Sequence, residues 1–170
     1  VRLVDDAGRD VDDEAEGEVW IKGPSVTPGY WARDNAEYFT DGWFRTGDVA
    51  RRDADGFFYL VDRVKDMYKS GGENVYPAEV ERLLLEHPDI VEVAIVGVRD
   101  ARWGEVGLAV VVPAPGAEVT LDTLSEVLDG RLARYKHPKQ LRIVETLLRN
   151  VTGKVDKIGL RAEYGGSHVA

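Results

Sequence analysis

Three charged side chains in this sequence suit the chemistry of sugars and phosphates. Asp48 follows a Thr-Gly pair, and its carboxylate can accept hydrogen bonds from both hydroxyls of a ribose. Arg63 lies in the charged run 62–66, and its guanidinium can hold a ribose or phosphate oxygen through a fork of donors. Lys154 follows a second Thr-Gly pair, and a mobile ammonium can stabilise charge that builds on phosphorus. These residues favour a nucleotide-dependent reaction.

Two of these side chains, taken alone, also have a purely structural explanation. Asp48 can be a turn aspartate that pairs with Arg45 or Arg51. Lys154 can be a solvated loop lysine, with Lys157 as its equal. Short motifs match by chance, so the order and context of several motifs must decide between the two explanations.

A longer motif occupies residues 69–81 and reads Lys-Ser-Gly-Gly-Glu-Asn-Val-Tyr-Pro-Ala-Glu-Val-Glu. The paired glycines Gly71 and Gly72 let a backbone approach a ligand without a Cβ in the way. The glycine pair alone can equally be a turn from a strand into a helix, with Glu73 and Asn74 as caps.

Two further candidates lie between predicted elements. Trp103 can stack on a base from a loop, or it can fold over the neighbouring sheet. Residues 135–138 read Tyr-Lys-His-Pro, and Lys136 and His137 can either meet phosphates or cap the end of a helix.

In their order along the chain, these motifs resemble the C-terminal portion of the adenylate-forming (ANL) superfamily. Residues 17–23, Gly-Glu-Val-Trp-Ile-Lys-Gly, and the following pair Gly29 and Tyr30 match another motif of that family. The resemblance covers essentially residues 17–160. The run 69–81 resembles acyl-CoA synthetases, also called fatty-acid–CoA ligases, more than the adenylation domains of peptide synthetases.

The resemblance implies a reaction in two steps. A carboxylate attacks the α-phosphate of MgATP, which gives acyl-AMP and pyrophosphate, and the thiol of CoA then displaces AMP. Lys154 would be the catalytic lysine of the first step, Asp48 and Arg63 would bind the nucleotide, and Lys65 would be the hinge between two domains. The residues implied in CoA binding are Lys69, Gly71, Gly72, Trp103, Tyr135 and His137.

We expect an α+β fold in two parts. Residues 1–64 would form a β-rich subdomain, a meander or small barrel with strands at 1–4, 17–22 and 57–61, which corresponds to the end of a large N-terminal domain. Residues 65–164 would form a small mobile C-terminal domain, and residues 165–170 a tail.

In the second part we expect a three-stranded sheet with flanking helices. Apolar runs predict strands at 90–98, 106–112 and 139–144. A helix would start at Pro77 and continue through His87, and Thr120 would cap another that carries leucines at 121, 124, 128 and 132. A last helix would span 155–164.

Composition limits the possible partners. The net charge of −9 argues against a nucleic-acid partner, and the chain has no apolar run long enough to span a membrane. It contains no cysteine, so a thioester sulfur must come from a substrate, and an intracellular, cytoplasmic protein fits best. The histidines His87 and His168 show no metal-ligand spacing, and we predict no metal site.

The resemblance also implies what this chain lacks. The phosphate loop, the adenine and magnesium segment and the acyl pocket of the family would precede Val1, so the chain would be inert alone and would need the N-terminal part of its own enzyme. ATP, Mg²⁺ and CoA would serve the complete enzyme, with a carboxylic acid such as a fatty acid as substrate. Two alternatives stay open: an adenylation domain that loads a carrier protein, and a non-catalytic α+β interaction module.

Overall fold

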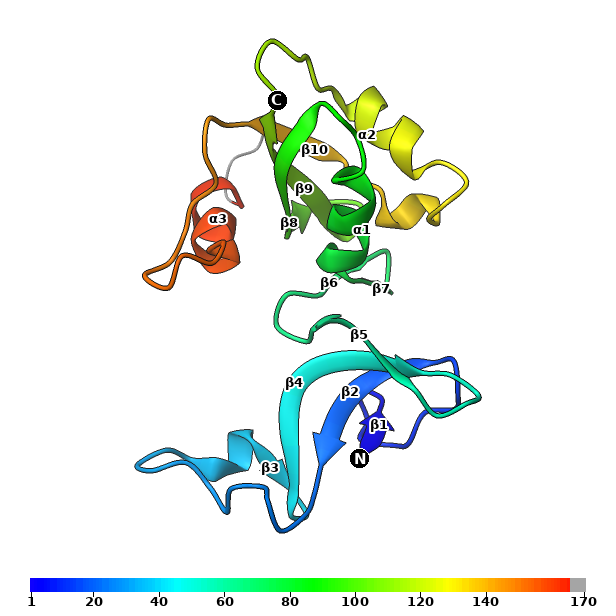
Figure 1. The fold of residues 1–170 in the computed structure, drawn as a ribbon, viewed down its shortest axis with the longest axis vertical. Helices are drawn as coiled ribbons and strands as arrows, with labels where there is room; N and C mark the ends of the chain where they lie inside the picture. The colour runs from blue at the N-terminus through cyan, green and yellow to red at the C-terminus, as the bar shows by residue number, and fades with distance from the viewer. Residues whose placement is uncertain (166–170) are drawn as a thin grey trace. The chain divides into compact units, whose positions relative to one another are not determined.

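The computed structural model describes residues 1–165, which divide into two compact units (Figure 1). The first unit is Val1–Lys65 and the second begins at Asp66. We describe each unit by itself. The expected tail, apart from Gly165, lies outside the described residues.

The first unit is an antiparallel sheet of five strands. Neighbouring pairs are β1–β2, β2–β4, β3–β4 and β4–β5, and these pairings leave the described sheet open rather than closed as a barrel. The strands expected at 1–4, 17–22 and 57–61 are confirmed as β1, β2 and β5. The bounds are β1 Arg2–Val4, β2 Glu16–Ile21, β3 Phe39–Thr40, β4 Trp43–Arg52 and β5 Phe58–Arg63, with a short 3-10 helix η1 at Asn35–Glu37.

The central strand β4 is the longest strand of the first unit, and cation–π contacts connect it with β1 and β2. The guanidinium of Arg45 lies 5.7 Å from the ring centre of Trp20, and that of Arg2 lies 5.9 Å from the same ring. The guanidinium of Arg2 also lies 5.1 Å from the ring centre of Trp43, and the ammonium of Lys22 lies 5.8 Å from that ring centre. This alternation links β1, β2 and β4 through cation–π attraction.

The second unit holds a five-stranded sheet with helices on both faces. β8 pairs antiparallel with β9, and β10 runs parallel to β9, so the three expected strands are confirmed. Two short strands that the sequence did not predict, β6 and β7, form a hairpin beside β9. The bounds are β6 Tyr68–Ser70, β7 Glu73–Val75, α1 Pro77–Leu84, β8 Ile90–Asp100, β9 Gly104–Pro113, α2 Leu121–Leu128, η2 Arg134–Lys136, β10 Gln140–Ile143 and α3 Lys157–Tyr164.

Alternate residues of β8 pack into two separate hydrophobic cores. Val93 and Ile95 pack in the core beneath α1 and α2, whereas Ala94 and Val96 pack in the core beneath α3. Figure 1 shows α3 on one side of this sheet and α1 with α2 on the other. Because both faces are covered, the strands read as continuous apolar runs rather than as alternating ones.

α1 and α2 begin where their caps predict, but both end earlier than expected, since α2 ends at Leu128 and does not include Leu132. α3 begins at Lys157, two residues later than expected. Pro77 occupies the first turn of α1, and the Thr120 side chain caps α2 together with Thr123. After Leu84 the chain forms tighter turns than an α-helix, since the His87 amide donates to the Leu84 carbonyl, three residues before it. His87 therefore lies in a turn that leads to Pro88, and not on the helix.

Candidate functional site

The Thr-Gly-Asp motif forms a β-bulge in the middle of β4. Opposite the bulge, the register of β2 shifts between Glu18 and Trp20. Gly47 has φ +72°, a left-handed conformation that other residues adopt only with strain. Gly47 therefore allows the strand to bend, and Asp48 lies within β4 rather than at its end.

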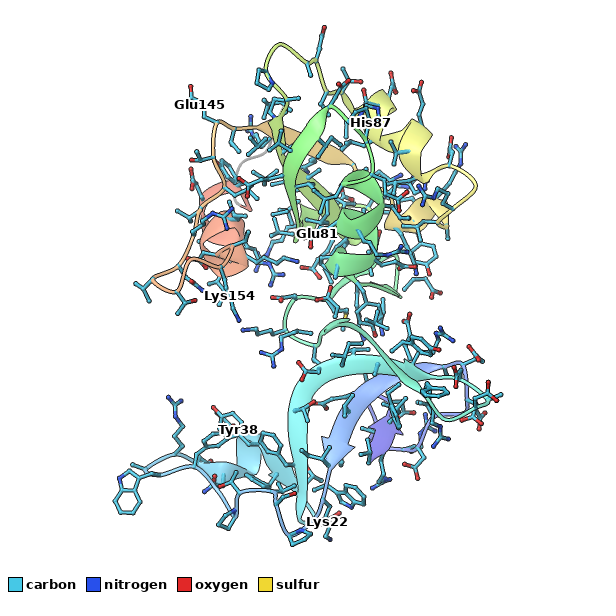
Figure 2. The ribbon with its side chains drawn as sticks, in the orientation of Figure 1. Lys22, Tyr38, Glu81, His87, Glu145 and Lys154 are labelled. Carbon is cyan, nitrogen blue, oxygen red and sulfur yellow. The ribbon has the colours of Figure 1, made fainter. Side chains whose placement is uncertain are left out.

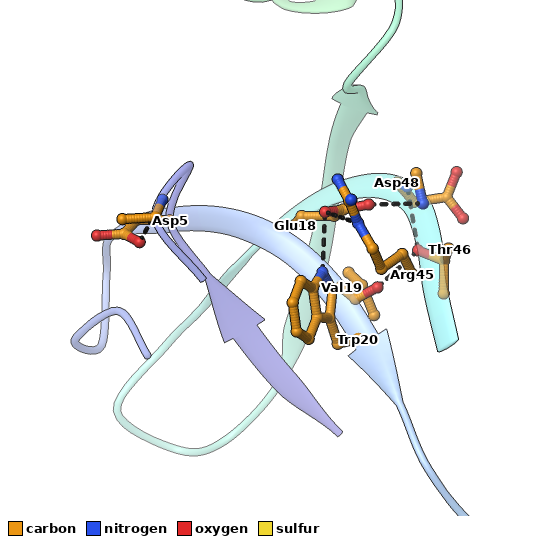
Figure 3. A network of polar contacts seen from close by, with 9 residues as sticks. Asp5, Glu18, Val19, Trp20, Arg45, Thr46 and Asp48 are labelled. Atoms are coloured by element: carbon orange, nitrogen blue, oxygen red, sulfur yellow. Dashed lines mark hydrogen bonds and ion pairs between the residues drawn. The ribbon is translucent and has the colours of Figure 1, made fainter. Parts of the chain in front are cut away.

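Side chains satisfy the backbone groups that the bulge removes from the ladder. The Thr46 hydroxyl donates to the Val19 carbonyl at 2.9 Å and accepts from the Asp48 amide at 3.0 Å (Figure 3). The Gly47 amide donates to the Glu18 carboxylate at 3.2 Å. Buried backbone groups must find partners, so these contacts fix the conformation in which Asp48 is presented.

Asp48 is paired with Arg63 across β4 and β5. The two residues are direct partners in the strand register, and Arg63 Nε donates to Asp48 Oδ1 at 2.6 Å. The alternative partners have other ion pairs, since Arg45 contacts Glu18 and Arg51 contacts Glu14. Both members of the Asp48–Arg63 pair stay partly exposed, with 34% and 50% of their side chains accessible, so a ligand can reach them.

A cleft of about 300 Å³ lies in the same unit. Its polar wall includes Arg63 and the bulge residues Thr46 and Gly47, and Lys65, the expected hinge, also lines it. The full lining is Glu18, Glu37, Tyr38, Arg45, Thr46, Gly47, Arg63, Val64 and Lys65.

Lys154 lies on a tightly bonded loop before α3 (Figure 2). Asn150 Oδ1 accepts from the Thr152 amide at 2.9 Å, the Thr152 hydroxyl at 2.7 Å and the Lys154 amide at 3.1 Å. Gly153 has φ +80° and closes the turn. The loop thus holds the backbone of Lys154 while its side chain is exposed.

Lys157 differs from Lys154 although the two are close in sequence. Lys157 Nζ pairs with Glu81 Oε1 at 2.8 Å, and only 17% of each side chain is exposed. Glu81 also accepts from the Ile95 amide at 2.7 Å, so the pair joins α3 to α1 and β8. Lys157 is therefore held by the fold and is not equivalent to Lys154.

The paired glycines form the turn of the β6–β7 hairpin, and the Glu73 and Asn74 expected as caps lie in β7. Gly71 has φ +62° and its amide donates to the Trp103 carbonyl at 2.9 Å. A Cβ on Gly71 would lie 3.0 Å from the Trp103 ring, so the glycine permits a close approach between the loops.

The structure brings Gly71 and Trp103 together, with Lys69 on the adjoining strand. Trp103 remains 44% exposed, and Arg102 lies over its ring at 4.8 Å. A second cleft, of about 460 Å³, is lined by nearby residues that include Arg99, Asp100 and Glu105.

The segment 135–137 divides between surface and core. Tyr135 is 38% exposed on η2, whereas His137 is 4% exposed and its Nε2 contacts the Leu132 carbonyl at 3.2 Å. His137 is thus largely enclosed by the fold, and its expected role in CoA binding stays a prediction. Lys136 pairs with Glu79 at 2.6 Å.

Residues 1–165 hold no group of three or more histidine, aspartate or glutamate residues that could bind a metal ion. In the same range, no helix is long and apolar enough to cross a membrane.

Part of the second unit matches a known protein family. Residues 79–154 match the family model of the AMP-binding enzyme C-terminal domain. The chain therefore carries an AMP-binding enzyme C-terminal domain, which lies within its second unit. The resemblance drawn from the motifs and the α+β fold class are both confirmed.

Several relatives of the chain are named as CoA synthases or CoA ligases. The chain is 48% identical over 167 residues to a feruloyl-CoA synthase of Amycolatopsis sp., covering 97% of this chain and 34% of that relative. It is 45% identical over 157 residues to the long-chain-fatty-acid–CoA ligase FadD13 of Mycobacterium tuberculosis, covering 91% and 31%. Among solved structures, ATP-bound MatB from Rhodopseudomonas palustris aligns with a TM-score of 0.86 at 38% identity, covering 97% and 34%.

The chain spans about a third of the length of the relatives it matches. Sequence reasoning did not assign a role to two residues that organise the candidate sites, Glu18 and Asn150. Glu18 was visible as the second residue of the motif at 17–23, and Asn150 as an Asn close before a Gly-Lys pair. Their partners, however, become known only from the geometry.

Proposed function

We propose that this chain is part of an AMP-forming acid–CoA ligase. The observation that carries the proposal is the Asp48–Arg63 pair, held on a β-bulge in a unit that also contains a cleft lined by Arg63. The proposal is supported by relatives named as CoA ligases and by a neighbour solved with ATP.

In the first step, a carboxylate attacks the α-phosphate of ATP to give acyl-AMP and pyrophosphate. Asp48 accepts hydrogen bonds from the ribose hydroxyls, and Arg63 orients the Asp48 carboxylate through its 2.6 Å contact. Lys154 contacts the carboxylate of the acid substrate and the α-phosphate of ATP, where its ammonium stabilises the charge that develops at phosphorus. Its exposed side chain and anchored backbone suit this role.

In the second step, the thiol of CoA attacks the acyl carbonyl and AMP leaves. The Gly71–Gly72 turn gives a narrow thiol arm access to the backbone, with Lys69 beside it, and Trp103 and Tyr135 offer exposed aromatic faces to the CoA nucleotide. Rotation of the backbone at Lys65, the last residue of the first unit, lets the second unit present each face in turn.

The proposal assigns the remaining parts of the reaction to the rest of a longer enzyme. The acid pocket and the phosphate loop lie on a missing N-terminal part, and the acid is an acyl or aryl carboxylate. We assign no Mg²⁺ ligand to residues 1–165, where no cluster of candidate ligands occurs, and the ion accompanies ATP. We place the reaction in the cytoplasm, where ATP and CoA are available.

The test separates the two steps in the full-length protein that contains this chain. Pyrophosphate release is measured with a panel of carboxylic acids for the wild type and Lys154→Ala, and CoA thioester formation is then measured from pre-made acyl-AMP. We expect Lys154→Ala to lower the first rate about a hundredfold or more and to leave the second largely intact.

Lys157→Ala is the matched control, because it removes a nearby lysine whose ammonium is held by Glu81. We expect it to lower stability while keeping most of the first-step rate. Equal losses in both lysine variants would show that the effect of Lys154→Ala comes from lost stability and not from the lost ammonium. If a carrier protein but not CoA accepts the acyl group, the chain belongs instead to an enzyme that loads carrier proteins.

A further inference from the structure

Glu18 is a largely buried carboxylate at the centre of a hydrogen-bond network in the first unit (Figure 3). Only 12% of its side chain is exposed. Its Oε2 accepts from Trp20 Nε1 at 2.8 Å and from Arg45 Nε at 3.3 Å, and its Oε1 accepts from the Gly47 amide at 3.2 Å. A charge with so little access to water depends on these donors for stabilisation.

The contact with Gly47 differs from the other two because it reaches the backbone of the β4 bulge. Gly47 directly precedes Asp48, and its carbonyl accepts from the Val64 amide at 2.9 Å on the other side of β4. The peptide groups around Gly47 are thus held from β2 and from the end of β5. The Glu18 contact limits rotation of the segment from which the Asp48 carboxylate projects.

We propose that Glu18 is a positioning residue for sugar recognition, acting through Gly47 on Asp48. This inference rests on the proposed function, in which Asp48 binds the ribose of ATP. In this role Glu18 acts through the backbone at Gly47 and not through a contact of its own with the nucleotide. It holds the bulge in the conformation that lets one carboxylate meet two hydroxyls, so its loss weakens the part of ATP affinity that depends on those hydroxyls.

Glutamine at this position separates the Gly47 contact from the rest of the network. Glutamine has one carbonyl oxygen, and Oε2 serves two donors whereas Oε1 serves one. We expect the amide oxygen to keep the side that faces Trp20 and Arg45, which turns the NH₂ group toward the Gly47 amide. Two donors then face each other at the bulge while the size of the side chain is unchanged.

The experiment measures binding of ATP and of 2′,3′-dideoxy-ATP to the full-length protein by calorimetry. The dissociation constant of dideoxy-ATP divided by that of ATP reports recognition of the ribose hydroxyls, and this ratio falls when that recognition is lost. Glu18→Gln should weaken ATP binding about tenfold, should leave dideoxy-ATP binding nearly unchanged, and should bring the ratio close to that of Asp48→Asn. Glu18→Ala, which removes all the contacts, should have the same or a larger effect.

Trp20→Phe is the control for a merely structural effect. It removes one donor to Glu18 and disturbs a side chain that is 6% exposed, but it leaves the Gly47 contact in place. We expect a lower melting temperature and an unchanged ratio. A ratio that falls in Trp20→Phe as it does in Glu18→Gln would overturn the inference, because it would follow from loss of stability alone.

The inference and the proposed function fail in different ways. If Asp48→Asn removes the preference for ATP and Glu18→Gln does not, Glu18 has no positioning role and the ribose site stands. If Asp48→Asn also keeps the preference, Asp48 does not bind ribose, and both statements are wrong.

Discussion

Lys154 and Lys157 show how closely spaced residues of one type acquire different roles. Lys157 forms an ion pair in which 17% of each side chain is exposed, so its ammonium is committed to Glu81. The Lys154 side chain is exposed, and the loop constrains only its backbone. A cation that must travel to a phosphate needs the second arrangement, because a partner inside the fold would have to be given up first.

We expect Asn150 to control how Lys154 is delivered. Its Oδ1 accepts from the Thr152 amide, the Thr152 hydroxyl and the Lys154 amide, so Asn150→Ala leaves the loop free to sample other conformations. Asn150→Asp retains the accepting oxygen. Acyl-AMP formation should fall about tenfold in the alanine variant and much less in the aspartate variant, as measured by pyrophosphate release.

Thioester formation from pre-made acyl-AMP is the control reaction for these Asn150 variants, and it should be nearly unaffected. If Asn150→Ala forms acyl-AMP at the same rate as the wild type, the hydrogen bonds of the loop are unimportant for the delivery of Lys154. A general loss of both reactions would indicate misfolding of the second unit instead.

Single residues were predicted well where their chemistry was local. The Thr-Gly-Asp run was visible in the sequence, and φ +72° explains why glycine stands at position 47. The partner of Asp48 was not evident, since Arg63 becomes its neighbour only through the register of β4 and β5. The burial of His137 was equally hidden, because it depends on packing after η2 and not on the residues beside it.

At the scale of elements, the second unit depends on a tyrosine that crosses a glycine pair. Gly97 and Gly107 are partners across β8 and β9, and Tyr68 of β6 fills the space above them. A Cβ on either glycine would lie 2.4 Å from a Tyr68 atom. The sequence did not predict β6 or β7, because strands of three residues are too short to show a period.

The Tyr68 hydroxyl gives this packing a dependence on pH. The side chain is 1% exposed, and within residues 1–165 its hydroxyl has no hydrogen-bond partner. Burial, and secondarily the charge of Glu105, raise the pKa of the Tyr68 hydroxyl well above its usual range. The folded state therefore holds the Tyr68 proton more tightly than the unfolded chain does. The contribution of Tyr68 to the free energy of unfolding is complete below about pH 10 and is lost as the pH rises further.

We expect Tyr68→Phe to change the free energy of unfolding by no more than about 1 kcal/mol at pH 7, because the lost hydroxyl has no partner. Above pH 10 the variant should become more stable than the wild type by a growing margin. Urea unfolding at pH 7 and at pH 11 measures both effects. Gly97→Ala serves as the contrast, and it should destabilise the unit at both pH values because its methyl group collides with the ring. Equal alkaline losses in wild type and Tyr68→Phe would contradict the assignment.

For the whole molecule, the candidate nucleotide residues and the candidate catalytic lysine lie in different units. Asp48 and Arg63 belong to the first unit, and Lys154 belongs to the second. The chain as a whole spans about a third of the length of its relatives. The proposed reaction therefore needs a binding wall for the acid and for the phosphates that these residues do not supply.

We expect residues 1–170, expressed alone, to fold but to release no pyrophosphate from ATP with any acid of the panel. ATP should bind at least about a hundredfold more weakly than to the full-length protein, since Asp48 and Arg63 form only one side of the nucleotide site. Calorimetry with ATP and an assay for acid-dependent AMP formation measure the two quantities, and the circular dichroism spectrum verifies that the chain is folded. AMP formation by the isolated chain, abolished by Lys154→Ala, would show that a complete active site is already present, and the division of the reaction proposed above would then be wrong.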